Sequence, residues 1–89
     1  MTNDTAINAT AVDMEQLRAI IAEVLDLDVA EVTDDAEYVK DLGLDSLLAL
    51  EMQLALEERY GVSITEEELR GAKSPRMTHE LLTEKTAAK

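Results

Sequence analysis

A serine stands directly after an aspartate and shortly after a glycine, in the run DLGLDSL at residues 41–47. Asp45 is predicted to cap a helix, which places Ser46 in the first turn with its hydroxyl directed to solvent. Free backbone N–H groups and the positive end of the helix dipole favour an anionic group at such a place. Helix capping alone also explains the pair, because serine and aspartate are both common capping residues.

Catalysis by Ser46 would need a base within hydrogen-bond reach. The single histidine, His79, is predicted on an exposed face of the last helix, and the chain has no Gly-x-Ser-x-Gly motif. Cysteine is absent, which excludes thiol catalysis, thiolate metal sites and disulfides. We therefore predict no catalytic role for Ser46 and no enzyme activity, although Ser46 can still be modified by another enzyme that brings its own base and metal ion.

Composition narrows the possible functions further. The chain has 89 residues, with 8 lysines and arginines against 20 aspartates and glutamates, which gives a net charge of −12. This length fits one small domain and leaves no room for a deep, enclosed active site. The negative charge and the presence of only two tyrosines as aromatic residues exclude nucleic-acid binding. The chain shows neither a membrane span nor a secretion signal, so a cytoplasmic location is expected.

The first half of the chain predicts one helix and a long connection. Residues 1–12 form a polar leader, and Asp13 with Gln16 has the spacing of a capping box. Apolar residues at intervals of three and four then predict a helix that ends near Leu27. The connection from 28 to 43 is long for a small domain, so its apolar residues are expected to anchor it to the core. These residues are Val29, Val32, Tyr38, Val39 and Leu42.

Three further helices are predicted in the second half. One runs from about 45 to 60 and ends at Gly61, and a short acidic one opens with the capping-box pair Thr65 and Glu68. The last begins at Ser74-Pro75, turns Met77, Leu81 and Leu82 inward, and gives way to a frayed tail at 85–89. The predicted fold is all-α, a four-helix bundle with a short third helix and a long first loop, in a domain spanning 13–84.

The helix from 45 to 60 carries two apolar stripes. One stripe suits a core face and consists of Ala49, Met52, Gln53, Leu56 and Tyr60. The other consists of Leu47, Leu50 and Leu54, and it is flanked by Glu51, Glu57 and Glu58. Either both stripes are buried in a central helix, or the second stripe stays exposed as a docking strip for partners with a basic rim. The pattern does not distinguish the two.

The run at 41–47, together with LALEERYGVSI at 54–64, resembles the acyl carrier proteins of fatty acid and polyketide synthesis. The resemblance extends over roughly residues 14–82. It implies a four-helix bundle in which a phosphopantetheinyl transferase attaches a 4'-phosphopantetheine arm from coenzyme A to Ser46. Asp45 would help present Ser46 to the transferase and its Mg²⁺. Acyl groups would ride as thioesters on the thiol of the arm, which suits a chain without cysteine.

The resemblance also implies a set of partners. In the family, ketosynthases, acyltransferases and other synthase enzymes contact positions that correspond here to Leu47, Leu50, Glu51, Leu54, Glu57 and Glu58. The carrier itself is expected to be a monomer that binds many enzymes weakly. We further hypothesise that the aliphatic core opens for a bound acyl chain. No metal site of the protein's own is expected.

The sequence also bears on the pathway of the carrier and leaves two other functions as alternatives. The polar leader and the Ser-Pro-Arg opening of the last helix favour a discrete carrier of a polyketide or similar pathway over primary fatty acid synthesis. Leu44-Asp45 disfavours a peptidyl carrier, although an aminoacyl carrier, such as one for D-alanine, is an alternative. A calcium-binding loop is a distant alternative, since Asp26, Asp28, Asp34 and Glu37 match ligand offsets of an EF-hand, but Glu31 stands where the turn needs glycine.

Overall fold

The computed structural model describes residues 12–87, and the predicted leader other than Val12 lies outside this range. Within it the chain forms helices and turns and no strand. The elements are α2 (Met14–Leu25), the 3₁₀ turn η1 (Val29–Glu31), α3 (Tyr38–Leu42), α4 (Ser46–Tyr60), α5 (Glu66–Gly71) and α6 (Pro75–Ala87). The all-α prediction is confirmed, with α2, α4, α5 and α6 as the four predicted helices.

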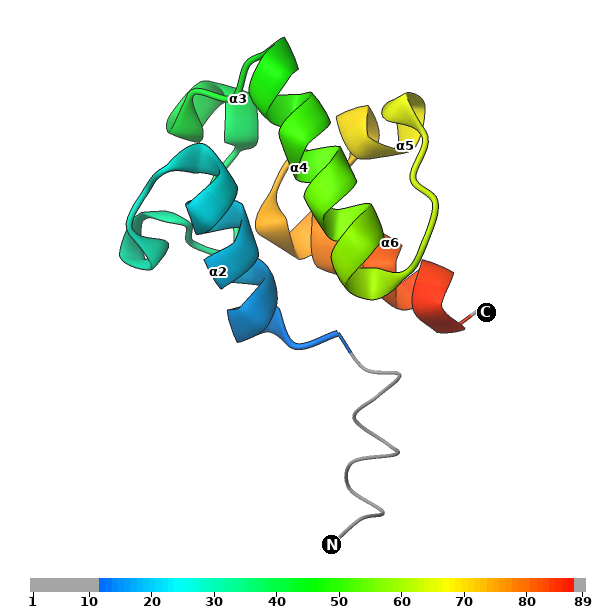
Figure 1. The fold of residues 1–89 in the computed structure, drawn as a ribbon. Coiled ribbons are helices and arrows are strands. Elements are labelled where there is room, and N and C mark those ends of the chain that lie inside the picture. The colour runs from blue at the N-terminus through cyan, green and yellow to red at the C-terminus, as the bar shows by residue number, and fades with distance from the viewer. Residues whose placement is uncertain (1–11, 88–89) are drawn as a thin grey trace, which may run out of the picture.

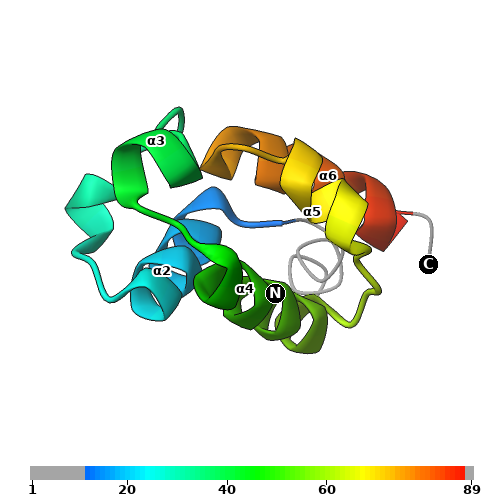
Figure 2. The same ribbon diagram turned by 90° about the horizontal axis from the view of Figure 1, so that it is seen from above.

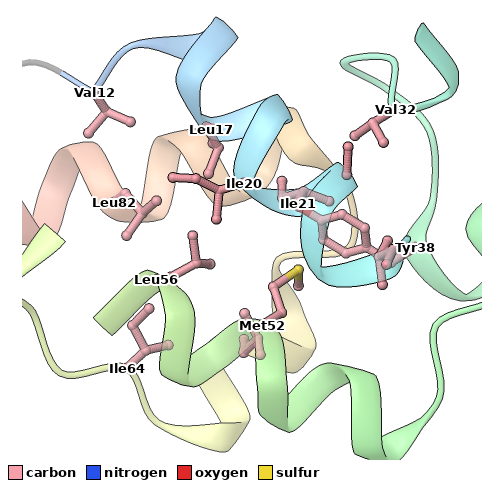
Figure 3. Packing of buried hydrophobic residues seen from close by; sticks show 13 residues of the cluster. Val12, Leu17, Ile20, Ile21, Val32, Tyr38, Met52, Leu56, Ile64 and Leu82 are labelled. Carbon is pink, nitrogen blue, oxygen red and sulfur yellow. The ribbon is translucent and has the colours of Figure 1, made fainter. Parts of the chain in front are cut away.

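The helices enclose one core between α2, α4 and α6. Helices α2 and α4 lie side by side, α6 packs against α2 behind them, and the short α5 lies next to α4 (Figures 1 and 2). The short α3 lies at the end of the molecule where α4 begins (Figure 1). Figure 3 shows side chains of all three long helices meeting in the space between them. The buried cluster consists of Val12, Leu17, Ile20, Ile21, Ala22, Leu25, Val32, Tyr38, Met52, Leu56, Ile64, Leu69 and Leu82.

Helix α2 begins and ends through its own backbone chemistry. Asp13 caps it by accepting a hydrogen bond from the Glu15 N–H at 3.0 Å, so the cap is present but the predicted reciprocal box with Gln16 is not. The helix ends at Leu25 and not at Leu27, because Asp26 adopts a left-handed conformation with φ 59°. Val12, the last residue of the predicted leader, is buried in the core.

The long connection contains two elements that the sequence did not predict, η1 and α3. Val32 and Tyr38 are buried and Leu42 packs against the core, as predicted. The predicted anchoring by Val29 and Val39 is wrong, because these side chains are 41% and 71% exposed. In α3 the helical period turns Val39 away from the core once its neighbour Tyr38 faces inward.

Two arginines, Arg18 and Arg76, also attach the connection to the helices, beside its buried apolar residues. The Arg18 guanidinium donates to the carbonyl oxygens of Val32 at 2.6 Å and Val29 at 2.8 Å. Arg76 forms a two-bond ion pair with Asp35, at 2.7 and 3.2 Å. The connection is thereby attached both to α2 and to the start of α6.

A buried hydroxyl pair joins α3 to α6. The Tyr38 hydroxyl lies 2.6 Å from Thr78 Oγ1, and Thr78 Oγ1 in turn lies 2.9 Å from the Ser74 carbonyl oxygen. Thr78 has one hydroxyl proton, which it donates to that carbonyl, so Tyr38 must donate to Thr78. Burial raises the pKa of the Tyr38 phenol, which keeps it protonated and able to donate.

Replacing Thr78 with valine is expected to lower the free energy of unfolding by about 1–3 kcal/mol, because the buried Tyr38 hydroxyl loses its acceptor. Urea denaturation followed by circular dichroism measures this change. Thr83→Val, at an exposed position of the same helix, is the matched control and is expected to be nearly neutral. Equal stability of the Thr78 and Thr83 variants would show that the hydroxyl pair contributes nothing.

Helix α6 starts as predicted and ends later than predicted. Ser74 caps it, with its Oγ 3.3 Å from the Met77 N–H, and Pro75 is its first residue. Met77 is 42% exposed, so its predicted inward position is wrong. The buried positions are taken by Thr78 and Leu82, while Leu81 is partly buried.

The predicted frayed tail is helical as far as Ala87, because side-chain contacts hold it. Lys85 Nζ lies 2.9 Å from Glu68 Oε1, and Thr86 donates to the Leu82 carbonyl oxygen. Glu68 also completes the predicted capping box with Thr65 at the start of α5. The backbone N–H of Thr65, and next the Lys85 ammonium, lower the pKa of the Glu68 carboxyl.

Candidate functional site

Two residues fix the turn before Ser46, Gly43 through its backbone conformation and Leu44 through its contacts. Gly43 has φ 72°, a left-handed conformation that favours glycine, and a Cβ there would meet nothing within 4 Å. The position therefore needs glycine for its backbone angle and not for space. Next in the chain, the Leu44 N–H donates to the Tyr38 carbonyl oxygen at 2.9 Å and its side chain packs against the core. The start of α4 is held in place by these contacts.

Asp45 and Ser46 take the positions that the sequence predicts. Asp45 Oδ1 accepts a hydrogen bond from the Leu48 N–H at 2.9 Å, so Asp45 is the N-cap and Ser46 the first residue of α4. Ser46 is exposed, and within residues 12–87 its hydroxyl forms no hydrogen bond. Since the first N–H groups of a helix have no partner inside it, the site offers a free hydroxyl beside free backbone donors.

Replacing Asp45 with alanine is expected to lower the free energy of unfolding by about 0.5–2 kcal/mol through loss of the cap. Thermal unfolding monitored by circular dichroism measures this. Asp45→Asn keeps the capping oxygen without the charge and is expected to stay within a few tenths of a kcal/mol of the wild type. An Asn variant as unstable as the Ala variant would contradict the capping role.

Among residues 12–87 the structure places no base beside Ser46. His79 is partly buried, so the prediction that it is exposed is wrong, and its Nε2 lies 2.7 Å from the Val12 carbonyl oxygen. Through this contact the His79 side chain links α6 to Val12, just before α2. In the described part of the chain no hydrogen bond joins Ser46 to a histidine or a carboxylate, so nothing activates the hydroxyl as a nucleophile.

The structure distinguishes the two apolar stripes of α4. Met52 and Leu56 are fully buried, with Ala49, Gln53 and Tyr60 partly buried beside them. The other stripe is exposed, with values of 63% for Leu47, 50% for Leu50 and 55% for Leu54. We call these three leucines the docking strip. Three large leucines exposed on one helix face are uncommon on the surface of a small domain.

The three carboxylates beside the docking strip are not equivalent. Glu51 and Glu58 are exposed and form no ion pair among residues 12–87, so their charges face solvent. Glu57 is partly buried, and its Oε2 accepts a hydrogen bond from the Ile64 N–H at 2.8 Å. Glu57 therefore holds the link between α4 and α5, a structural role that the sequence did not indicate.

A groove with a volume of about 550 Å³ starts beside Ser46 and passes between α4, α3 and α5. Its lining comes from segments far apart in the sequence, which is why the sequence did not predict it. No spacing rule connects Val39 or Lys73 with Ser46. The lining residues are Glu37, Tyr38, Val39, Leu44, Asp45, Ser46, Ala49, Leu50, Gln53, Glu66, Leu69, Arg70, Ala72 and Lys73.

The groove can hold a chain that is apolar over part of its length. Its inner wall includes Ala49, Leu69 and Ala72, whereas the charged residues of its lining are all exposed. An anionic group on Ser46 would sit at the start of α4, and a flexible chain extending from it could enter this groove. The local residues thus fit a phosphate-linked arm.

The calcium-loop alternative gains no support. Across residues 12–87 no three or more histidine or acidic side chains come together as a metal ion would require. Asp26 ends α2, and Asp34 lies 3.9 Å from both Arg18 and Arg76. The described helices also include none that is both long and apolar enough to cross a membrane.

Comparison with known proteins agrees with the geometry. Residues 15–82 match the family model described as a phosphopantetheine attachment site. Polyketide-8 synthase acyl carrier protein 2 of Streptomyces avermitilis is 58% identical over 76 residues, which cover 85% of this chain and 87% of that protein. The acyl carrier protein of Helicobacter pylori strain G27 is 54% identical over 54 residues, 61% of this chain and 69% of that protein.

A solved structure has the same fold. The A1-type ACP domain from module 5 of MLSA1 superposes with a TM-score of 0.72 and 27% identity, over 90% of this chain and 80% of that one. The conclusion rests on three observations. Ser46 is exposed at a capped helix start, the family model matches most of the chain, and the relatives are acyl carrier proteins. The chain belongs to the acyl carrier proteins, which carry acyl groups on a 4'-phosphopantetheine arm.

Proposed function

We propose that Ser46 is the residue that carries the arm, and that the protein serves as a carrier in a polyketide pathway. One observation supports this assignment above the others: the Ser46 hydroxyl is exposed at a capped helix start beside the groove and forms no hydrogen bond within residues 12–87. The name of the Streptomyces relative supports the polyketide pathway. The arm supplies the thiol on which an acyl group is held as a thioester.

The residues around Ser46 present the hydroxyl and do no chemistry on it. Loading joins Ser46 Oγ to the phosphorus atom of coenzyme A that bears the pantetheine, and the pyrophosphate bond breaks. The nucleotide leaves as adenosine 3',5'-bisphosphate, and the hydroxyl proton passes to a base. Since no base contacts Ser46 among residues 12–87, the phosphopantetheinyl transferase would provide it together with Mg²⁺. Asp45 fixes the direction in which Ser46 is offered.

Incubation with coenzyme A and a promiscuous transferase tests the assignment directly. Intact mass spectrometry is expected to show one added arm on the wild-type protein, and peptide mapping is expected to locate it at Ser46. A wild-type protein that remains unmodified, while a known carrier in the same reaction is loaded, would refute the proposal.

We propose that the docking strip and its carboxylates form the surface that synthase partners bind. Exposed leucines surrounded by Glu51 and Glu58 suit an enzyme with an apolar groove and a basic rim, such as a ketosynthase or an acyltransferase. The net charge of −12 would speed the encounter, and the small apolar area would allow release.

Reversing the charge of both Glu51 and Glu58 to lysine is expected to slow association with a basic-rimmed ketosynthase by about tenfold, since steering charges act on the association rate. Stopped-flow measurements at low and at high salt report it, and the difference is expected to shrink at high salt. The control carries Glu23→Lys on α2 and Glu84→Lys on α6, two exposed positions that form no ion pair among residues 12–87, and it has the same net charge. An equal loss in the control would assign the effect to net charge and not to this surface.

A further inference from the structure

Gln53 is a polar residue in the inner part of the groove. It follows Ser46 by seven residues, or about 10 Å along the axis of α4. The side chain is partly buried and lines the groove. A polar side chain among the apolar residues of a carrier groove calls for a chemical explanation.

The amide of Gln53 has a defined orientation. Its Nε2 donates to the Ile64 carbonyl oxygen at 2.6 Å, and only the nitrogen of the amide can donate to a carbonyl. The Oε1 atom is therefore the opposite end of the amide. Within residues 12–87 this oxygen accepts no hydrogen bond, and it is not among the enclosed side-chain oxygens. Gln53 thus offers an accessible hydrogen-bond acceptor on a residue that lines the groove.

The surroundings make this acceptor distinctive. Ala49, Leu69 and Ala72 line the same groove and offer no side-chain hydrogen bond. The Tyr38 hydroxyl is engaged with Thr78. The charged lining residues, Glu37, Asp45, Glu66, Arg70 and Lys73, are all exposed.

A purely apolar chain in the groove would cover the Gln53 oxygen and leave it without water, which is unfavourable. A chain with a hydroxyl or an amide N–H at that depth would satisfy it. Gln53 therefore stabilises a bound chain that has a hydrogen-bond donor at that depth and destabilises one that does not.

We propose that Gln53 is a specificity-determining residue that favours chains with a hydrogen-bond donor two helical turns beyond Ser46. This inference rests on the proposed attachment at Ser46. The donor has two possible sources, an amide N–H of the arm itself or a hydroxyl of the acyl cargo, as in a 3-hydroxyacyl group. Both present the same chemistry to Oε1.

Four forms of the protein test the proposal: apo, holo, octanoyl and 3-hydroxyoctanoyl. Thermal unfolding gives the Tm of each, and NMR follows the Gln53 side-chain amide and the methyl groups of Ala49 and Leu69. If the cargo hydroxyl is the donor, the 3-hydroxyoctanoyl form is expected to melt about 4–8 °C above the octanoyl form. If the arm is the donor, the holo form is expected to show the same increase in Tm over the apo form. The NMR signals of the Gln53 side-chain amide are then expected to change between apo and holo. Both results support the proposal and identify the source.

Gln53→Met removes the acceptor with little change of volume. It also removes the bond to Ile64, which lowers the Tm of all four forms, and the forms that present a donor to Gln53 are expected to lose their additional stability as well. The Tm difference between the octanoyl and 3-hydroxyoctanoyl forms, or between the apo and holo forms, isolates the contribution of the donor, as in a double-mutant cycle. This difference is expected to vanish in the Gln53→Met variant. Gln16→Met, at an exposed glutamine of α2, is the matched control and is expected to keep the difference.

The proposal is overturned if the octanoyl form is at least as stable as the 3-hydroxyoctanoyl form while the Gln53 amide signals stay unchanged in all loaded forms. The NMR measurement uses the wild-type protein, so it decides the question even if Gln53→Met does not fold. Failure of the Ser46 assignment is seen separately, because mass spectrometry would then show no arm on Ser46 before any melting is measured.

Discussion

Replacing Ser46 with alanine is expected to abolish attachment of the arm, reducing the loaded fraction from near completion to none detectable. The change removes the oxygen to which the phosphorus would be joined, so no residual activity is expected. Intact mass spectrometry after incubation with coenzyme A and a transferase measures the loaded fraction. The variant is expected to fold normally, within about 0.5 kcal/mol of the wild type, because Ser46 is exposed.

Ser63→Ala is the matched control for this experiment. Ser63 is also an exposed serine, but it lies in the extended link between α4 and α5, with no helix start at its position. The control is expected to load as completely as the wild type. An arm attached to the Ser46→Ala protein would contradict the assignment and direct the search to another hydroxyl.

Leu56→Ala is expected to lower the free energy of unfolding by about 2–5 kcal/mol, a large part of the stability of a domain this small. Leu56 is completely buried on α4 between α2 and α6 (Figure 3), and truncation leaves a cavity there. The corresponding fall in Tm is at least about 8 °C. Urea denaturation of the apo protein measures the loss.

Leu54→Ala is the matched comparison, with the same change two residues earlier on the same helix. Leu54 is 55% exposed, so its truncation is expected to change the stability by no more than about 0.5 kcal/mol. Its effect should instead appear as weaker binding to a ketosynthase, measured with the holo protein. If the two variants lost equal stability, the assignment of core and docking strip on α4 would be wrong.

Local signals in the sequence predicted much of the fold and of the site. The caps at Asp13, Asp45, Thr65 and Ser74 and the left-handed turn at Gly43 are all present. Each depends on a side chain bonding to its own neighbouring backbone, or on one residue's backbone freedom. Such effects act over a few residues, so the order of residues is sufficient to reveal them.

The errors concern residues whose environment is made by distant segments. Val29, Val39 and Met77 are apolar but exposed, whereas Thr78 is polar and buried because the Tyr38 hydroxyl reaches it from 40 positions away. The five-residue helix α3 is too short to show a period of its own and is held by tertiary contacts. Apolar character alone does not determine which side chains the core can accommodate.

The sequence by itself determined α2, α4, α5 and α6, their caps and the placement of Ser46 at an exposed helix start. Only the tertiary structure decided which stripe of α4 is buried, formed the groove, and gave Glu57 and Gln53 their contacts with Ile64. A cap depends on neighbours along the chain, whereas burial and a groove depend on which helices come together, and that is settled by the packing of the whole domain.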